Sequence, residues 1–430
     1  VFIKLFILIF FVLSFFIIFL NFYGIETKRF NNLVESEIKN LNKNINVTLN
    51  KIKIKFDFKN INLYFETNNP KVIFVDSYIP VEKIKVYLNL KKLLKNQKNI
   101  DEVKIDVKEV EYKNLNGLIK IIKPSNFKSI LLENIKGGTI KSNLILKFDK
   151  DFKITSYEID GYVRNLKSQY NDFNINKSSF IYTIRNKSGE ITNFSGKINK
   201  IAFNNAKIEY ANENGIILNI KSDLSGVINK DNIINFLTKD QKSHLSDFDL
   251  KYITNSSHML NIKLDNNFKI KSYKYNIQKS SDILKLKFKT PIKSNFLNKE
   301  IKNFEIKDIN LKSNVSSDNK NVLSLKGIYN LNNSEYENIS VESQLTKKSK
   351  KFLVNFSSKA NVFIPILNYN NNKSKFNVVL DLINSEKFYE LKKFSFEQGK
   401  NRIKIDNFKL NKNFKIISLK NMQVETFYND

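Results

Sequence analysis

The chain has 430 residues and a formal net charge of +30, and hydrophobic residues make up 41% of it, which excludes a disordered protein. The positive charge comes almost wholly from Lys. The four Arg are too few for bidentate contacts to phosphates and bases, so we expect no nucleic-acid partner. A basic surface would only favour contact with anionic lipid head groups. With no Cys and two His, the sequence excludes disulfides, thiolate chemistry and a His-based zinc site, and predicts no metal and no cofactor.

The first element is an apolar segment at residues 1–24, in which Ser14 is the only polar residue between Leu5 and Leu20. A helix of about 20 residues rises roughly 30 Å, so the segment predicts an uncleaved transmembrane anchor. A signal peptide would need a shorter apolar core and small residues at its end, and the exit here is bulky. We expect a single-pass inner-membrane protein with the bulk of the chain in the periplasm.

Residues 25–50 predict an amphipathic connector. Apolar residues recur there at helical spacing and form one stripe: Phe30, Val34, Ile38, Leu41 and Ile45. We expect this helix to pack on the start of the following sheet, with partner binding as the alternative.

Residues 51–125 change to a period of two, which predicts an N-terminal β module. The alternating apolar positions are Ile52, Ile54, Phe56, Phe58, Leu63, Phe65, Ile84, Val86, Leu88, Leu90, Val103, Ile105 and Val107. Strict alternation is typical of antiparallel strands with one apolar and one polar face. Short helices are expected at residues 91–97 and 115–122.

Residues 126–430 predict strands and turns almost throughout. Alternation recurs at Leu144, Leu146 and Phe148, at Leu284, Leu286 and Phe288, and at Ile403, Ile405, Phe408 and Leu410, where a one-residue slip indicates a bulge. One further helix is expected at residues 231–245. The excess of Lys, Asn, Ile and Phe is interpreted as drift toward A/T-rich codons.

An internal repeat occurs three times, at residues 147–158, 263–274 and 409–420. Each copy reads as a strand, a polar Asp/Asn turn with Phe-Lys-Ile, and a second strand, which predicts a β-hairpin. The copies lie far apart, so the unit between them contains several strands.

The apolar faces of these strands must be covered, and the predicted helices are too few to do it. On pattern alone, β-sandwiches are favoured over one curled sheet that holds apolar cargo, and a transmembrane β-barrel fits the helical anchor badly. The candidate lining of a curled sheet is Ile52, Ile54, Phe56, Phe58, Ile84, Val86, Leu88, Leu90, Leu144, Leu146, Phe148, Leu284, Leu286 and Phe288. Any of these residues would equally serve as sandwich core.

The order of features resembles the AsmA-like family and its YhdP- and TamB-type members. The likeness rests on the anchor, the alternating strands, the elements at residues 86–95 and 100–107, and the repeated hairpins. Residues 231–241 are similar to a short helix of the YhdP-type branch, although Thr238 stands where that branch has Pro. The resemblance implies a fold of an N-terminal transmembrane helix followed by a long, curled antiparallel sheet, a repeating β-groove with a few short helices. It implies that the groove carries phospholipid between inner and outer membrane and so supports outer-membrane integrity.

Two functions of different class therefore stay open: lipid transfer along a groove, and an anchored β-sandwich assembly or structural factor that binds other envelope proteins. The chain lacks the nucleophile elbow, the His-Glu-x-x-His motif and a Gly-rich phosphate loop, so we expect no enzyme. His244 with Asp247 and Asp249 is the nearest approach to a catalytic cluster and is interpreted as a solvated loop. Val1 in place of Met and an end in mid-pattern indicate an N-terminal fragment, although a GTG start would also explain Val1.

Overall fold

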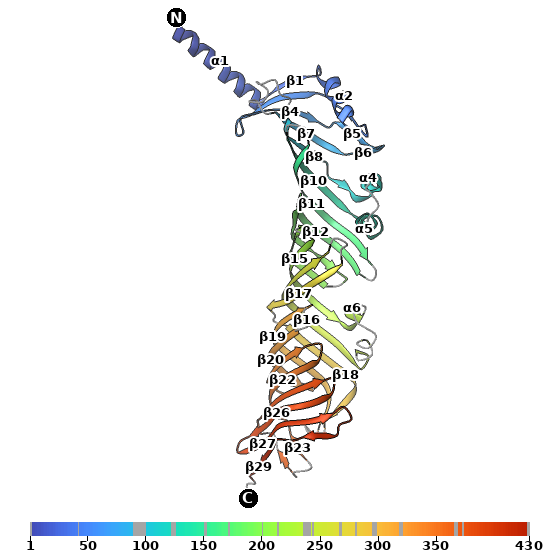
Figure 1. Ribbon diagram of the computed structural model, residues 1–430, viewed down its shortest axis with the longest axis vertical. Helices are drawn as coiled ribbons and strands as arrows, with labels where there is room; N and C mark the ends of the chain where they lie inside the picture. The colour runs from blue at the N-terminus through green and yellow to red at the C-terminus, as the bar shows by residue number, and fades with distance from the viewer. Residues whose placement is uncertain are drawn as a thin grey trace. The chain divides into compact units, whose positions relative to one another are not determined.

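The coordinates are a computed structural model and fall into two units, residues 1–196 and 197–430, with the division inside β13 (Ser188–Ile198). The structure describes residues 2–41, 43–88, 100–121, 126–149, 153–170, 173–199, 201–212, 215–234, 242, 245–265, 269–279, 282–294, 299–317, 321–364, 369–371 and 374–427. Both units are mainly β and are built from curled antiparallel sheet with a few short helices, as the family resemblance implies and in place of the β-sandwiches that the pattern alone favours (Figure 1).

Unit 1 begins with a helix and continues as antiparallel sheet. Its helical elements are α1 (Phe2–Phe22), α2 (Asn31–Leu41), η1 (Tyr112–Leu115), α4 (Asn116–Ile121), α5 (Asn126–Ser129) and η2 (Ile130–Asn134). Its strands are β1 (Ile25–Thr27), β2 (Ile45–Thr48), β3 (Ile52–Asp57), β4 (Asn62–Asn68), β5 (Lys71–Phe74), β6 (Ser77–Ile79), β7 (Val81–Leu88), β8 (Ile100–Val107), β9 (Val110–Glu111), β10 (Ile135–Phe148), β11 (Ile154–Tyr170), β12 (Phe173–Arg185) and β13. The sheet runs β1–β3–β4–β7–β8–β10–β11–β12, every pair antiparallel, and β9 also pairs with β10. Strands β2, β5 and β6 form a separate small sheet.

Unit 2 is antiparallel sheet with one short helix, α6 (Lys230–Ile233). Its strands are β14 (Ile201–Asn212), β15 (Ile216–Asn229), β16 (Phe248–Leu264), β17 (Ile270–Lys279), β18 (Asp282–Ser294), β19 (Lys299–Ser316), β20 (Asn321–Leu331), β21 (Glu337–Leu345), β22 (Ser349–Ser358), β23 (Val362–Ile364), β24 (Tyr369–Asn371), β25 (Phe376–Ser385), β26 (Phe388–Gln398), β27 (Asn401–Asn411), β28 (Ile416–Ser418) and β29 (Asn421–Glu425). Sequence neighbours pair in order, with three exceptions. Strands β17 and β18 each pair with both β16 and β19, β22 pairs directly with β25, and β28 and β29 both pair with β27. The skipped strands β23 and β24 form their own two-stranded sheet.

Left-handed residues inside strands accompany irregularities in the sheet. Backbone φ is 51–52° at six mid-strand positions: Asn165, Lys177, Asn193, Asn205, Asp308 and Asn407. Asn and Asp tolerate this conformation better than other side chains, and a bulge built on it bends its strand and increases the local twist. Asn407 separates Ile405 from Phe408 at the slip in alternation, but the pairing of β27 with β26 keeps one register across it, so the bulge predicted there is not confirmed.

The three repeat copies fold as the same hairpin. In each copy the first residue of the turn pairs its backbone N–H with the carbonyl four residues on, at 3.0, 2.9 and 3.0 Å for Asp149, Asp265 and Asn411. The side-chain oxygen of that same residue accepts the backbone N–H of Lys153, Lys269 or Lys415. The strand register also shifts at the same place in all three hairpins. The predicted repeat is therefore confirmed at the level of individual hydrogen bonds.

The apolar N-terminal segment forms α1, which extends away from the sheet of unit 1 (Figure 1). Within the described residues, however, none of the helices is sufficiently long and apolar to span a bilayer. The helix expected at residues 1–24 is thus present, but the transmembrane part of that prediction is not supported.

The other predicted helices have different outcomes. The connector at residues 25–50 contains α2, and Asn31 donates to the carbonyl of Leu49 at 3.0 Å while Glu35 accepts the N–H of Leu49 at 2.6 Å. These bonds hold α2 against the residues that lead into β3. The helix expected at residues 115–122 is η1 with α4. The one expected at 91–97 lies outside the described residues, and of 231–245 only the start falls on a described helix, α6.

Candidate functional site

The apolar face of unit 1 consists of cross-strand rows of side chains. Because directly opposed residues of an antiparallel pair lie on the same face, the register identifies each row. The longest row crosses seven strands through Ile25, Ile54, Phe65, Val86, Val103, Leu146 and Tyr157. A parallel row contains Phe56, Leu63 and Leu88, and a third contains Ile84, Ile105 and Leu144. The register thus places the alternating residues of five separate sequence segments on one surface.

The apolar face of unit 2 follows the same rule. Leu284 lies between Tyr252 and Ile306, Leu286 between Leu250 and Phe304, and Phe288 opposite Phe248. A further row, here called the long row, crosses eight strands through Leu311, Leu325, Val341, Val354, Leu380, Phe394, Ile405 and Met422. At about 4.8 Å per strand the long row measures roughly 34 Å, similar to the thickness of a bilayer's hydrocarbon core.

Most side chains of these rows are half-buried, although Ile306 is 4% exposed and Leu311, Leu325 and Phe394 pack against buried clusters. Of the candidate lining residues that are described, only Ile52 is fully buried, and in the long row every residue before Met422 is intermediate in exposure. The apolar faces therefore retain area that a bound apolar molecule would cover.

One part of the apolar face of unit 2 is covered by the chain itself. The hairpin of β23 and β24 packs over β25–β27, where Val362 and Phe376 are 0% exposed and Phe396 is 1% exposed. The rings of Tyr369 and Phe396 meet edge to face at 5.9 Å. We call this cluster the covered core, because its burial matches that of a closed domain interior.

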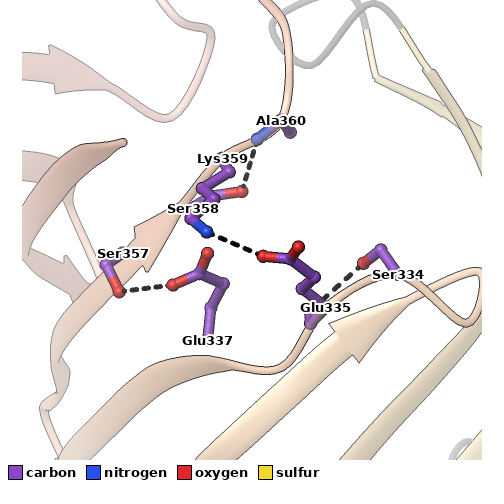
Figure 2. Close-up of polar contacts among 7 residues, drawn as sticks. All are labelled: Ser334, Glu335, Glu337, Ser357, Ser358, Lys359 and Ala360. Carbon is purple, nitrogen blue, oxygen red and sulfur yellow. Dashed lines mark hydrogen bonds and ion pairs between the residues drawn. The ribbon is translucent and has the colours of Figure 1, made fainter. Parts of the chain in front are cut away.

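Polar contacts hold the segment that leads into this cover. Lys359 pairs with Glu335 at 2.8 Å, and the Ser357 hydroxyl donates to Glu337 at 3.3 Å (Figure 2). The hydrogen bond to Lys359 lowers the pKa of Glu335, and the two side chains are 75% and 55% exposed, so the pair contributes little to stability. These contacts position the connection after β22, while burial of Val362 and Phe376 provides most of the stabilisation.

A chain of polar side chains interrupts the apolar face of unit 2. On β16, Thr254 and Ser256 contact each other at 2.6 Å, Ser256 contacts His258 Nε2 at 2.7 Å, and His258 Nδ1 contacts the Tyr275 hydroxyl at 2.5 Å. Burial lowers the pKa of His258. Close by, the buried Asp282 accepts hydrogen bonds from Tyr252 and from a backbone N–H.

The distance from Ser256 to His258 is that of a nucleophile and its base, but the surroundings are not those of an active site. Ser256 is 3% exposed, and the second ring nitrogen of His258 contacts the Tyr275 phenol where a catalytic triad has a carboxylate. We interpret this row of hydrogen-bonded side chains as structural, because each buried polar group in it has a hydrogen-bond partner. The expectation that the protein is not an enzyme stays a prediction.

The opposite faces of both sheets carry paired charges. In unit 1, Glu66 is 6% exposed and lies 3.5 Å from Lys55 and 3.8 Å from Lys85, while Tyr64 stacks on Tyr87 at 5.0 Å. In unit 2 a shallow hollow of about 550 Å³ is lined by Lys251, Lys285, Lys287, Asp249, Glu305 and their neighbours.

Burial acts to raise the pKa of Glu305 in this hollow, but the hydrogen bond and charge of Lys285 outweigh burial, and the pKa is lowered. Lys285 pairs with Glu305 at 3.0 Å in this hollow, and charged and amide residues make up most of its lining, which is a poor environment for apolar cargo. The hollow therefore does not compete with the apolar face as the candidate site.

The candidate residues chosen from sequence divide into three groups. Those on β3, β7, β10 and β18 lie on the apolar faces described above. Phe58 lies in the turn after β3 and is 52% exposed, so it extends the face only through an edge contact with Phe56 at 5.6 Å. Leu90 lies outside the described residues, as does His244, and Asp249 lines the charged hollow.

The long row is the functional candidate that sequence reasoning missed. Its signal was present as alternation, for example at Leu323 and Leu325 and at Val378 and Leu380. Among the described residues, no group of three His, Asp or Glu side chains is placed to hold a metal ion.

Comparisons with protein-family models, with curated proteins and with solved structures find no significant match. The resemblance to the AsmA-like family, and the activity that it implies, therefore stay predictions.

Proposed function

We propose that this protein is held at a membrane by α1 and carries phospholipid, bound by its acyl chains, along the apolar faces of its curled sheet. The observation that carries the proposal is the set of half-buried cross-strand rows, above all the long row from Leu311 to Met422. Exposing an acyl chain to water costs about 0.8 kcal/mol per CH₂, so a continuous apolar row lowers the cost of moving it.

The setting that fits this activity is the space between the two membranes of a diderm bacterium. Support comes from the resemblance to AsmA-like proteins and from the apolar side chains that α1 presents to its surroundings, with Phe6 and Phe15 each 72% exposed. In this proposal the chain attaches to the inner membrane, its bulk lies in the periplasm, and lipid transfer supports the outer membrane.

Site-specific photo-crosslinking tests the proposal. A photoreactive phenylalanine analogue replaces Phe56 or Phe288 in the full chain, and Lys55 or Lys287 in the matched controls, because neighbouring strand residues lie on opposite faces. We expect phospholipid adducts at the two Phe positions, and phospholipid in the purified protein by mass spectrometry. Equal labelling of both faces, or protein recovered free of lipid, would refute the proposal.

An anchored assembly factor is the second candidate, and the covered core around Phe376 and Phe396 favours it, because that part of the sheet is closed. It predicts co-purification of an envelope protein with lipid-free chain. Recovery of lipid at Phe288 without such a protein would exclude it as the main function.

A further inference from the structure

The third repeat hairpin, between β27 and β28, carries several exposed apolar side chains close together. Around its turn the side chains of Phe414, Ile416, Ile417 and Leu419 are 71%, 70%, 55% and 47% exposed, and Met422 on β29 is 53% exposed. Monomeric proteins seldom expose several large apolar side chains side by side, and such patches mark interaction sites. We call residues 411–420 the hairpin tip.

The hairpin tip is also basic. Residues 407–424 contain four Lys and no Asp or Glu. Lys412 lies 4.0 Å from the ring centre of Tyr389 and donates to Asn384 at 2.7 Å, while Lys415 and Lys420 are exposed beside the apolar side chains. Apolar and cationic side chains together are the chemistry that binds the surface of an anionic bilayer.

Phe414, Lys415 and Ile416 recur in the first and second copies as residues 152–154 and 268–270, so only the residues around them distinguish the third copy. Asp149 and Asp265 accept the N–H of the Lys four residues on at 2.9 Å, and Asn411 does the same at 3.0 Å. The third copy thus keeps the turn while replacing a carboxylate by a neutral amide. It also has Ile417 where the other copies have Thr155 and Lys271.

Phe414 occupies a conformation that its side chain disfavours. Its φ is 58°, in the left-handed region, where a bulky residue is an outlier and Asn or Gly is usual. The ring stacks on Tyr389 at 5.4 Å with an interplanar angle of 9°, yet remains 71% exposed. The contact with Tyr389 thus holds an exposed aromatic ring in a fixed orientation at the tip.

We propose that the hairpin tip binds the surface of an anionic lipid bilayer, with Phe414, Ile416 and Ile417 entering the head-group region and Lys415 and Lys420 contacting lipid phosphates. This surface belongs to unit 2 and does not depend on whether the apolar face of the sheet holds lipid. Loss of bilayer binding by the hairpin tip therefore leaves the lipid crosslinks expected at Phe288 unchanged. Each of the two proposals, lipid transfer and tip binding, can thus be refuted without refuting the other.

A fluorescent label tests the proposal, because the chain has no Cys of its own. The full chain is held in a zwitterionic nanodisc, so that α1 is already covered, and a polarity-sensitive dye is attached at Ile416→Cys. The matched control is Ile270→Cys, at the equivalent position of the second copy and 63% exposed. Vesicles of phosphatidylcholine, with or without phosphatidylglycerol, are then added.

We expect the dye at residue 416, and not at residue 270, to move to an apolar environment with the anionic vesicles, and salt to weaken the effect. The double variant Asn411→Asp with Asn413→Asp keeps the turn chemistry of the first copy and should weaken vesicle binding by about 25-fold, at roughly fivefold per charge. Equal responses at both positions, equal binding to neutral vesicles, or a dye at 416 already shielded before vesicles are added would each overturn the proposal.

Discussion

The half-buried state of the apolar face can be tested by comparing two truncations in unit 2, Leu286→Ala and Phe376→Ala. Leu286 lies on the open part of the face between Leu250 and Phe304, whereas Phe376 lies in the covered core at 0% exposure. If the open part is not sealed by a facing layer, the first substitution should cost far less stability than the second, although both remove a large apolar side chain.

The magnitudes follow from what each side chain loses. Leu→Ala removes three carbons, about 2.4 kcal/mol when fully buried, so roughly 1 kcal/mol for a half-buried side chain that leaves no cavity. Phe376 loses its buried area, leaves a cavity, and gives up ring contacts with Phe356 at 6.3 Å and with Phe396 at 5.4 Å. Its truncation should cost about 4 kcal/mol.

Hydrogen exchange measured on peptides is the suitable assay, because two units need not unfold as one two-state transition. Peptides from β18 and β25 report the free energy of local opening around each substitution in lipid-free protein. A loss of 3 kcal/mol or more at Leu286 would mean that a second layer covers this part of the face, and the reasoning for an open face would be wrong.

Three further predictions concern single positions. Gly161→Ala should destabilise unit 1 by several kcal/mol in chemical denaturation, because an added Cβ would lie 2.0 Å from the carbonyl of Lys141, and Gly161→Ser should be no better. Asn205 has a φ of 51°, a left-handed conformation that Gly adopts freely and Ala does not. Asn205→Gly should therefore leave the free energy of unfolding nearly unchanged, and Asn205→Ala should lower it by about 1 kcal/mol. Equal effects of the two substitutions would contradict the left-handed bulge. Burial raises the pKa of Tyr87 from 10.0 to about 12, so its contribution to stability is present below pH 10 and is lost as pH rises from 10 through 12. Phenolate absorbance should show a late titration whose amplitude falls by one tyrosine in Tyr87→Phe, because the pKa values of Tyr64 and Tyr329 are also raised to about 12.

The sequence predicts the strands and their faces well, because alternation with period two depends only on local geometry. Ile54, Val86 and Leu146 were assigned to one apolar face from alternation alone, and the register places them in one row. The repeat likewise predicted three hairpins, since a turn built on Asp149, Asp265 or Asn411 needs only residues close in sequence.

The bends of the sheet could not be predicted in the same way. The left-handed positions Asn165, Asn193 and Asn205 look like any other Asn in a chain rich in this residue, and the abundance of Asn was interpreted as codon drift. The structure gives these side chains a specific role, because a bulge at mid-strand needs a residue that tolerates positive φ. Composition alone cannot separate such positions from the rest.

Whether the apolar face is open or covered depends on a further property, the length of the connections between strands. A cover must leave the sheet edge, cross the face and return, and two-residue turns cannot do this. The connection between β22 and β25, residues 359–375, is long enough to form β23 and β24, and there Phe376 and Phe396 are sealed. The connections at residues 332–336 and 399–400 are short, and the neighbouring positions Val341 and Ile405 of the long row stay half-buried. Shortening 359–375 to a tight turn should therefore extend the open face across β25 and β26, and photo-crosslinking of lipid from position 396 should then appear where the unaltered chain gives none.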